Sequence, residues 1–405
     1  MPKHVFEGLK AVGFVYAGVG TFVLRILALH GATVVRVESE TRPDNVRTMA
    51  PYKDGIPGLN RSYYYNSPNT DKYDLALDMK HPRKDEVAKR LVEWADVLVE
   101  NFTPGVIASW NLSYDEVKKI NPSIIMISLS MQGQTGPARL QGGYGALLQS
   151  LVGYPLITGW PDGVPCVIDR SYPDYISPRY GAIAVIAALL HRRRTGKGQY
   201  IDVSEYEDAI QFEIPVILDW VVNHRMQTRM GNKCPYAAPH GAYRCKGDDR
   251  WCVIAVFTDP EWQTFCKVIG NPEWTKQAKF STLLARKQNE DELNQLVEEW
   301  TISHTAEEVM NMMQQAGVKA GVVQTVEDVV EYDPQLKHRH FFWTLKHPEC
   351  GETIHNRPNY VLSKTPSELR MPAPLLGEHT DYVCKELLQM PEDEYISLLL
   401  DNVFK

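Results

Sequence analysis

The sequence predicts an α/β fold, with a large sheet-containing domain at the start of the chain and a smaller α+β domain after it. Three observations predict this fold. Short apolar strands alternate with amphipathic helices from Gly8 onward, as in proteins built on a parallel sheet. Of the 405 residues, 44% are hydrophobic, which is enough for a large core. The composition changes after about residue 226, and at ~150 residues per domain this length predicts two or three domains.

The first predicted unit is a β-α-β motif at the N-terminus. Residues 9–15 form a short apolar stretch typical of a strand, and Gly18 and Gly20 predict the turn that follows it. An amphipathic pattern then predicts a helix through Leu29, and residues 34–38 predict a second strand. Because a helix connects the two strands, we expect them to be parallel.

Further strands and helices repeat this alternation. Residues 97–100 and 123–129 are short apolar runs typical of buried strands. The other expected elements are a strand at residues 74–79 and helices at residues 84–95, 114–120, 146–151 and 180–193. Glycine and proline are dense between residues 130 and 173, which indicates loops of the kind that often carry function.

Residues 225–330 predict the smaller α+β domain. They contain a strand-like run and several helical patterns, one of which opens with a capping box of Thr305 and Glu308. Residues 331–405 contain too few elements for a core of their own. We therefore expect a large domain that begins with residues 1–224 and is completed by the C-terminal segment 331–405.

Charge and cysteine content argue against several classes of function. The 43 Lys and Arg against 50 Asp and Glu give a formal net charge of −7, which offers no positive surface for nucleic acid. The seven cysteines are odd in number and include no C-x-x-C pair, so we expect reduced thiols. The N-terminus lacks the pattern of a signal peptide, and the longest apolar run, residues 182–190, is too short to cross a membrane. We expect a cytoplasmic protein that binds neither nucleic acid nor membrane.

The glycine turn after the first strand contains part of a dinucleotide-binding motif. Glu38 lies 20 residues after Gly18, the spacing of an acid that binds a ribose. Val23, however, occupies the position of the third glycine. The favoured interpretation is a tight turn at which the backbone approaches a ligand.

Motifs for metal binding and for common hydrolases are missing from the sequence. The histidines form no His-x-x-x-His pattern, and His338 and His340 are expected in a solvated basic turn. Neither a Gly-x-Ser-x-Gly elbow nor a Walker-type loop occurs. We expect no metal site and no permanently bound cofactor.

An acidic residue, Asp174, stands between the glycine-rich loops and the helix predicted at residues 180–193. An acid here can cap the helix by accepting hydrogen bonds from its free amides. The same position suits a carboxylate nucleophile, because neighbouring backbone amides can stabilise an oxyanion beside it. Position alone does not choose between these two interpretations.

Motifs along nearly the whole chain resemble those of one enzyme family. They include His30-Gly31-Ala32-Thr33-Val34-Val35-Arg36-Val37-Glu38 and lie, in family order, at residues 30–38, 69–72, 77–80, 95–106, 133–137, 158–163, 194–199 and 373–380. In this order and spacing the chain resembles the class III CoA-transferases, of the formyl-CoA transferase and carnitine CoA-transferase type. The resemblance implies a Rossmann-like large domain formed by both chain termini, and a dimer of two interlocked rings. Because some branches pair related subunits, either a homodimer or a heteromer is expected.

The resemblance also implies a site and a reaction. Counting back from Thr195 by the family's spacing identifies Asp174 as the nucleophile. The implied reaction moves CoA from an acyl-CoA to a free carboxylic acid through an aspartyl mixed anhydride and an aspartyl-CoA thioester. Coenzyme A enters as the thioester substrate, and Lys80 would contact its phosphates. The positions that correspond to the family's CoA contacts are Ala17, Val19, Leu77, Lys80, Asn101, Phe102 and Val106.

Several positions depart from the family pattern. Ser39 and Ser109 stand where formyl-CoA transferase-like members have arginines, and Gly18 replaces a glutamine beside the nucleophile. Residues 230–236 lack the glycine run that covers oxalate in related enzymes. We therefore expect an acceptor larger than oxalate, carnitine-like or benzylsuccinate-like. Arg179 is either the partner of a second carboxylate or a surface arginine at a helix start.

Two alternatives share this resemblance. An α-methylacyl-CoA racemase-like isomerase would use an Asp and His pair to move an α-proton. No histidine occurs between His81 and His191, the region in which that partner is expected. The second alternative is a non-catalytic CoA-binding subunit of a heteromeric transferase, against which Asp174 is the argument.

Overall fold

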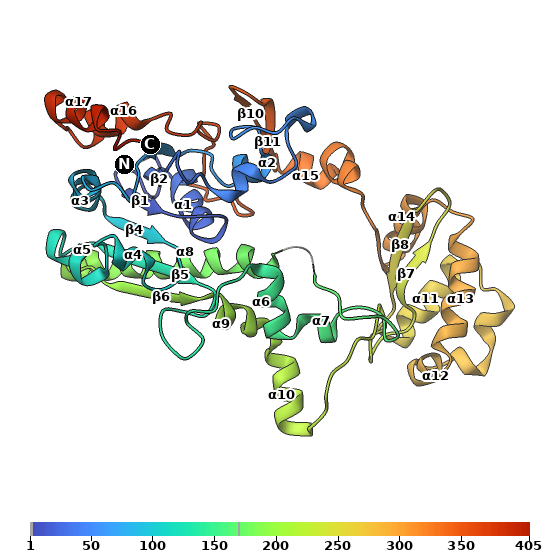
Figure 1. Ribbon diagram of the computed structural model, residues 1–405. Coiled ribbons are helices and arrows are strands. Elements are labelled where there is room, and N and C mark those ends of the chain that lie inside the picture. The colour runs from blue at the N-terminus through green and yellow to red at the C-terminus, as the bar shows by residue number, and fades with distance from the viewer. Residues whose placement is uncertain (1–2, 169–170) are drawn as a thin grey trace. The chain divides into compact units, whose positions relative to one another are not determined.

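The chain forms two compact units in a computed structural model that describes residues 3–168 and 171–405 (Figure 1). The large unit comprises Met1–Tyr154, Val167–Met226 and Lys337–Lys405, and the small unit comprises Pro155–Cys166 and Gln227–Leu336. Segments from both ends of the chain therefore share the large unit, where Figure 1 shows the C-terminal helices beside N-terminal elements.

A six-stranded parallel sheet forms the centre of the large unit, in the order β3-β2-β1-β4-β5-β6. Its strands are β1 (Lys10–Phe14), β2 (Thr33–Glu38), β3 (Tyr73–Ala76), β4 (Val97–Glu100), β5 (Ile125–Ser130) and β6 (Tyr200–Ser204). The predicted α/β fold with a parallel sheet is confirmed. The strand order reverses between β1 and β4, and ligands of such sheets bind beyond the carboxyl ends of the strands at this point.

Helices cover both faces of this sheet, and a separate apolar core lies on each face. One core contains residues of α3 (Lys84–Trp94) and of α17 (Glu392–Leu400). The other contains residues of α1 (Val19–Leu29) and α8 (Tyr172–Thr195), which pack against each other. The α1 and α8 pair therefore lies on one face of the sheet, with the start of α1 directly after β1.

Helix α8 begins earlier than the sequence predicts. Its first residue is Tyr172, whereas the prediction placed the start at residue 180 beyond Pro178. Pro178 lies inside the helix and is buried, although it has no N–H for the carbonyl four residues before it. Packing outweighs this lost hydrogen bond: a Cβ on Gly181 would lie 3.1 Å from side-chain atoms of Leu129 and Val23, so the helix approaches the sheet closely. Asp174 therefore lies within the first turn of α8, not ahead of the helix.

Shorter elements complete the large unit. Two of them, β10 and β11, pair as an antiparallel hairpin. The elements are α2 (Tyr63–Asn66), α4 (Val106–Ser109), α5 (Tyr114–Ile120), α6 (Gly145–Val152), α9 (Glu205–Ile210), α10 (Ile214–Asn223), β10 (Phe342–His347), β11 (Gly351–Asn356) and α16 (Thr380–Tyr382).

The small unit contains a three-stranded antiparallel sheet, ordered β7-β8-β9. Its strands are β7 (His240–Arg244), β8 (Trp251–Ala255) and β9 (Lys319–Val322), and its longer helices are α11 (Asp259–Val268), α13 (Glu290–Thr301) and α14 (Ala306–Gln315). The rings of Trp262, Phe265 and Phe280 fill its core. The predicted capping box of Thr305 and Glu308 is present at the start of α14.

Membrane-spanning helices and disulfide bonds are absent from the part of the chain that the structure describes. No helix in it is long and apolar enough to span a bilayer. The seven cysteines are free, and six of them are buried.

Candidate active site

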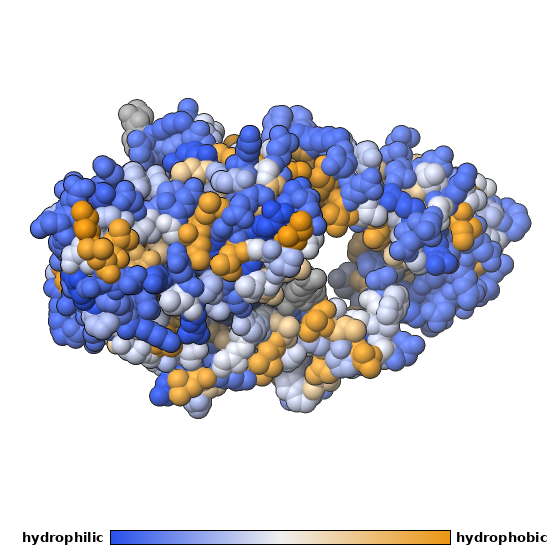
Figure 2. Space-filling model, turned by 45° about the horizontal axis from the view of Figure 1, so that its top comes forward, coloured by the Kyte–Doolittle hydropathy of each residue, from blue (hydrophilic) through white to orange (hydrophobic). Residues whose placement is uncertain are grey.

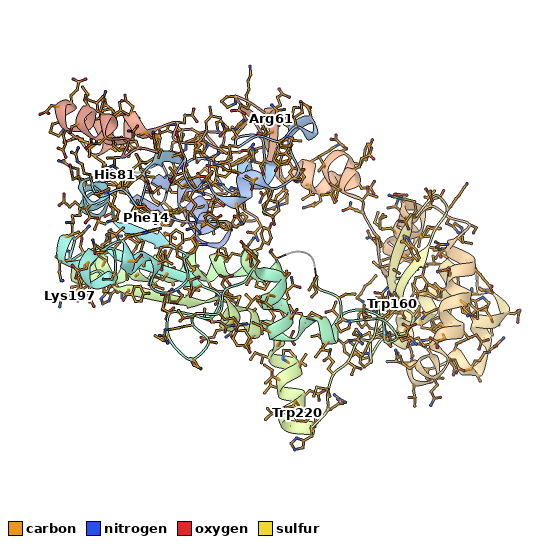
Figure 3. All side chains as sticks on the ribbon, viewed as in Figure 1. Phe14, Arg61, His81, Trp160, Lys197 and Trp220 are labelled. Atoms are coloured by element: carbon orange, nitrogen blue, oxygen red, sulfur yellow. The ribbon has the colours of Figure 1, made fainter. Side chains whose placement is uncertain are left out.

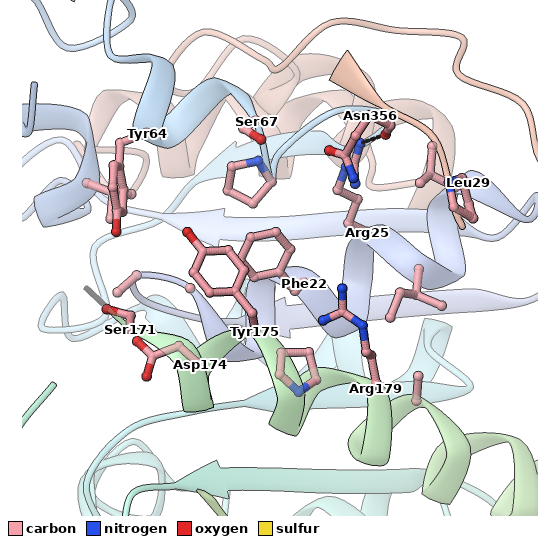
Figure 4. A pocket seen from close by; sticks show the side chains of 18 of the residues that line it. Phe22, Arg25, Leu29, Tyr64, Ser67, Ser171, Asp174, Tyr175, Arg179 and Asn356 are labelled. Atoms are coloured by element: carbon pink, nitrogen blue, oxygen red, sulfur yellow. Dashed lines mark hydrogen bonds between the residues drawn. The ribbon is translucent and has the colours of Figure 1, made fainter. Parts of the chain in front are cut away.

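A cavity of about 900 Å³ opens in the large unit beside α1 and α8 (Figure 4). Its walls come from the β1–α1 loop, both helices, the segment around α2 and the segment after β11. The lining residues that bear on chemistry are Ala17, Gly18, Phe22, Arg25, Tyr64, Tyr144, Ser171, Asp174, Tyr175, Pro178, Arg179, Phe341, Asn356, Arg357 and Tyr360. Most of this surface is apolar or aromatic, which is typical of small-molecule sites.

Asp174 lies at one end of this cavity, in the first turn of α8 and next to Ser171 (Figure 4). Burial raises the pKa of its carboxyl group to about 6, although a hydrogen bond from the Ser171 hydroxyl and its own backbone amide act in the opposite direction. The amino end of a helix favours a negative charge at this position. Asp174 therefore combines access to the cavity with an ionised but poorly solvated carboxylate near neutral pH.

The first residue of α6, Gly145, approaches this carboxylate closely. A Cβ at position 145 would lie 2.5 Å from Asp174 Oδ1 and 2.7 Å from the Ser171 Cα. Only a residue without a side chain fits against Asp174 here.

Two further acids lie on α9, which packs against both α8 and α6. Glu205 is only 8% exposed, and burial together with the charge of Asp174 raises its pKa to about 8. Burial also raises the pKa of Asp208 to about 6, although Ser177 of α8 acts against this shift. Burial and the nearby Asp174 carboxylate therefore favour the neutral form of Glu205. Sequence reasoning missed both acids, because acids in the first turn of a helix are usually solvated caps.

The β1–α1 loop is fixed beside Asp174 by side chains from distant segments. The amide of Ala17 donates to Asp44 Oδ1 at 3.0 Å and to Oδ2 at 2.9 Å, and Ala17 has a left-handed φ of 59°. Asn101 accepts from the Tyr16 amide at 2.9 Å and donates to the Tyr16 carbonyl at 2.7 Å. The loop that leads into α1 is therefore held in a defined conformation.

The predicted CoA contacts divide into two groups. Ala17 lines the cavity together with Asp174. The others lie outside the cavity wall: Val19 starts α1, Leu77 and Lys80 follow β3, Asn101 and Phe102 follow β4, and Val106 starts α4. Since β1, β3 and β4 are parallel, all of them lie toward the same carboxyl edge of the sheet. Leu77 is fully buried, and its amide donates to the Glu38 carbonyl, so the residue presents no surface to a ligand.

The two serines at the expected arginine positions bond to the protein's own backbone. Ser39 Oγ donates to the Lys405 carbonyl at 2.8 Å, and Ser109 Oγ donates to the Val106 carbonyl at 2.6 Å. Lys80, by contrast, is exposed.

Glu38 belongs to a buried ionic network and is not available for a ribose. It accepts from Arg47 Nε at 2.7 Å and from the Asp44 amide at 2.9 Å, and Arg36 lies 3.8 Å away. Burial opposes the ionisation of Glu38, but Arg36 and Arg47 outweigh it and lower its pKa to about 2. The dinucleotide interpretation of the glycine turn therefore has no free acid to support it. In the described ranges, 3–168 and 171–405, no cluster of three His, Cys, Asp or Glu is arranged for a metal.

Comparison with known proteins identifies the family. The chain matches the sequence profile of CoA-transferase family III over residues 6–380, and it belongs to this family. It is 31% identical over 384 residues to succinyl-CoA–D-citramalate CoA-transferase of Chloroflexus aurantiacus, covering 95% of this chain and 94% of that protein. It is 29% identical to the succinyl-CoA:glutarate CoA-transferase of Mus musculus, covering 98% and 90%.

A solved structure agrees with this assignment. A CAIB/BAIF family protein from Brucella suis aligns with a TM-score of 0.86 and 30% identity, covering 95% of this chain and 99% of that chain. The protein is therefore a class III CoA-transferase, and CoA thioesters are the substrates of such enzymes.

Proposed function

We propose that the enzyme transfers CoA between two carboxylic acids through acylation of Asp174. The observation that carries this proposal is the placement of Asp174, a carboxylate with a raised pKa at the end of a largely apolar cavity in the first turn of α8. Family membership supplies the class of reaction. The resemblance in spacing to Thr195 and the geometry of the cavity support the same residue.

The proposed reaction proceeds by four balanced substitutions. The Asp174 carboxylate attacks the thioester carbonyl and expels CoA thiolate, which gives a mixed anhydride. The thiolate attacks the Asp174 carbonyl, releases the donor acid and leaves an aspartyl-CoA thioester. An acceptor carboxylate attacks that thioester and regenerates thiolate and an anhydride. The thiolate then attacks the acyl carbonyl, which yields the new acyl-CoA and free Asp174.

Groups around Asp174 suit these steps. Its pKa of about 6 leaves the carboxylate ionised at neutral pH and more basic than a solvated aspartate. Phe22, Tyr175 and Pro178 line the adjacent wall and reduce the access of water, which would hydrolyse an anhydride. The amides of the first turn of α1 lack acceptors within the helix, so we assign them to developing oxyanions.

Coenzyme A would approach from the carboxyl edge of β1, β3 and β4. The exposed Lys80 serves as the partner of its phosphates, as a point charge. The acceptor would be larger than oxalate, which suits a cavity of about 900 Å³ with aromatic walls. Relatives of the chain are named for citramalate, glutarate and oxalate as partner acids.

The surface of α10 supports an assembly of two chains. None of its ten residues is buried, although most are apolar; Trp220 is 49% and Val222 is 71% exposed. Figure 3 shows Trp220 on this helix, and Figure 2 shows apolar groups on the molecular surface. Relatives include separate alpha and beta subunits of a succinyl-CoA–L-malate CoA-transferase. We assign this face to a second copy or a related subunit, in a cytoplasmic dimer.

One experiment separates this proposal from its alternatives. The protein is incubated with succinyl-CoA and then with hydroxylamine or borohydride, and the modified peptide is mapped by mass spectrometry. We expect modification at Asp174, and Asp174→Ala should abolish both modification and exchange. A racemase would instead exchange the α-proton of the acyl group with solvent deuterium. Such an enzyme needs a histidine partner, and no histidine occurs among the described residues that line the cavity. A non-catalytic subunit would show neither modification nor exchange.

A further inference from the structure

The charges that line the cavity differ in sign from those of the whole protein. Asp174 is the single acid among the described residues of its wall, which also contains Arg25, Arg179 and Arg357. The chain as a whole has a net charge of −7. A cavity with excess positive charge in an acidic protein favours anionic ligands.

Arg25 is a buried cation without a carboxylate partner. It projects from α1, is 6% exposed, and donates from Nε to Thr70 Oγ1 at 3.3 Å and from Nη2 to the Asn356 carbonyl at 2.7 Å. Within the described ranges no carboxylate lies at ion-pair distance from it. Burial lowers its pKa to about 10, and the more distant Asp71 only partly offsets this effect. The two neutral oxygens orient the guanidinium but leave its charge uncompensated.

Arg179 faces the same part of the cavity from α8 (Figure 4). It is exposed, and no hydrogen bond or ion pair to another described residue holds its guanidinium. The third arginine differs, because Arg357 donates to the Arg339 carbonyl at 3.2 Å and lies 5.2 Å from the Trp343 ring. Arg25 and Arg179 are the two cations, among the described residues of the wall, that project from the same helices as Phe22 and Tyr175.

Aromatic side chains lie between these two arginines and Asp174. Arg179 is five residues after Asp174, which places it about 7.5 Å farther along the helix axis. Phe22 precedes Arg25 on α1, and Tyr175 precedes Arg179 on α8. Their rings lie 5.2 Å apart, between Asp174 and the two arginines (Figure 4). The wall therefore presents a reactive carboxylate, then aromatic surface, then two cations.

We propose that Arg25 and Arg179 bind the distal carboxylate of a short dicarboxylic acid whose other carboxyl group exchanges CoA at Asp174. This inference rests on the proposed function and adds the class of its substrate. Guanidinium groups bind carboxylates through paired, charge-assisted hydrogen bonds, and the methylene chain of the acid packs against Phe22 and Tyr175. The enzyme then selects dicarboxylates over monocarboxylates of equal length.

Matched acceptors test this selection. Steady-state exchange is measured with succinate against butyrate, and with glutarate against valerate, for the wild type and for Arg179→Gln. We expect the variant to raise KM for the dicarboxylates about 10- to 100-fold and to leave the monocarboxylates unchanged. Arg179→Lys should recover part of the loss, and Arg193→Gln, an exposed arginine farther along α8, serves as the control.

Two further measurements make the outcome decisive. Calorimetric titration of succinate into Asp174→Ala, with and without Arg179→Gln, reports binding without chemistry, and we expect the second change to weaken it by the same factor. Size-exclusion chromatography confirms that the variant keeps its assembly. If Arg179→Gln raises KM equally for succinate and butyrate, or for neither of them, the proposed arginine subsite is wrong. Failure of the proposed function looks different, because no acyl donor would then modify Asp174 in the wild type.

Discussion

Two groups of buried arginines in the large unit differ in what surrounds them. Behind β2, Arg47 donates to Glu38 at 2.7 Å, and Arg36 contacts Asp44. In the cavity, Arg25 has two neutral oxygen partners and no carboxylate partner among the residues that the structure describes. The paired arginines fix a loop, because Asp44 also accepts from the Ala17 amide in the wall of the cavity. We assign the guanidinium of Arg25 to the carboxylate ligand proposed above.

The carboxyl groups of the two regions show the same contrast. In the network, Arg36 and Arg47 overcome the effect of burial and lower the pKa of Glu38 to about 2. Near the cavity no cation of the described residues lowers the pKa of Asp174 or Glu205, and burial raises these pKa values to about 6 and about 8. The charges of the first region stabilise one another, whereas burial destabilises the carboxylates of the second region. Substitutions in the paired network should therefore lower mainly stability, and substitutions near the cavity should lower mainly activity.

The largest expected effect is that of Asp174→Asn on activity. Removal of the proposed nucleophile should lower CoA exchange by at least about 10⁴-fold. The folded state should gain about 1–3 kcal/mol at pH 8, because a carboxyl whose pKa is raised above its unfolded value destabilises the fold as pH rises through that range. Exchange assays and urea unfolding at pH 8 measure the two effects. An inactive variant that is also clearly less stable would contradict this contrast.

In the paired region the change Asp44→Asn should act mainly on stability. It removes the charge opposite the fully buried Arg36, and breaking such a pair costs about 3–5 kcal/mol. Urea unfolding measures this loss. Asp54→Asn is the matched control, because Asp54 is exposed and solvent screens its ion pairs with Lys53 and Arg61, so we expect little change in stability. Equal effects of the two substitutions would show that the network does not stabilise the loop.

Local patterns predicted most of the sheet. The alternation of apolar runs and glycine turns located β1, α1 and β2, since each depends on residues close in sequence. The start of α8 was wrong, because Pro178 is a local signal for a break, whereas Gly181 allows packing against Leu129 that only the folded sheet provides.

The candidate site was predicted less completely. The resemblance to a family directed attention to Asp174 and Arg179, both of which line the cavity. No pattern indicated Arg25 or Glu205, because Arg25 lies within an apolar helix and Glu205 follows β6 as an ordinary first-turn acid. Their roles depend on which partners the fold places beside them, and these partners are distant in sequence.

The change Glu205→Gln tests the contrast between the two regions, because it should alter how the stability of the protein depends on pH. The pKa of Glu205 rises from about 4.5 to about 8 on folding, so the wild type loses stability as pH increases across this window. The variant lacks this loss and should gain about 2–4 kcal/mol relative to the wild type between pH 5 and pH 8. Unfolding free energies measured across this range test it. The exposed Glu207, changed to Gln, is the control and should leave the pH profile unchanged. If the unfolding free energies of Glu205→Gln and the wild type change in parallel with pH, Glu205 is ionised beside Asp174.

The smallest expected effect is steric and lies at Gly145. A methyl group there would lie 2.5 Å from Asp174 Oδ1 and 2.7 Å from the backbone of Ser171, so either the carboxylate or the start of α6 must shift. Because the proposed reaction requires Asp174 to align with a thioester, we expect Gly145→Ala to lower kcat about 10- to 100-fold, with little change in assembly. Gly142→Ala is the control, since nothing lies within 4 Å of its Cβ position. If both variants exchange CoA at the wild-type rate, the close approach of α6 does not position Asp174, and burial alone determines how its carboxylate reacts.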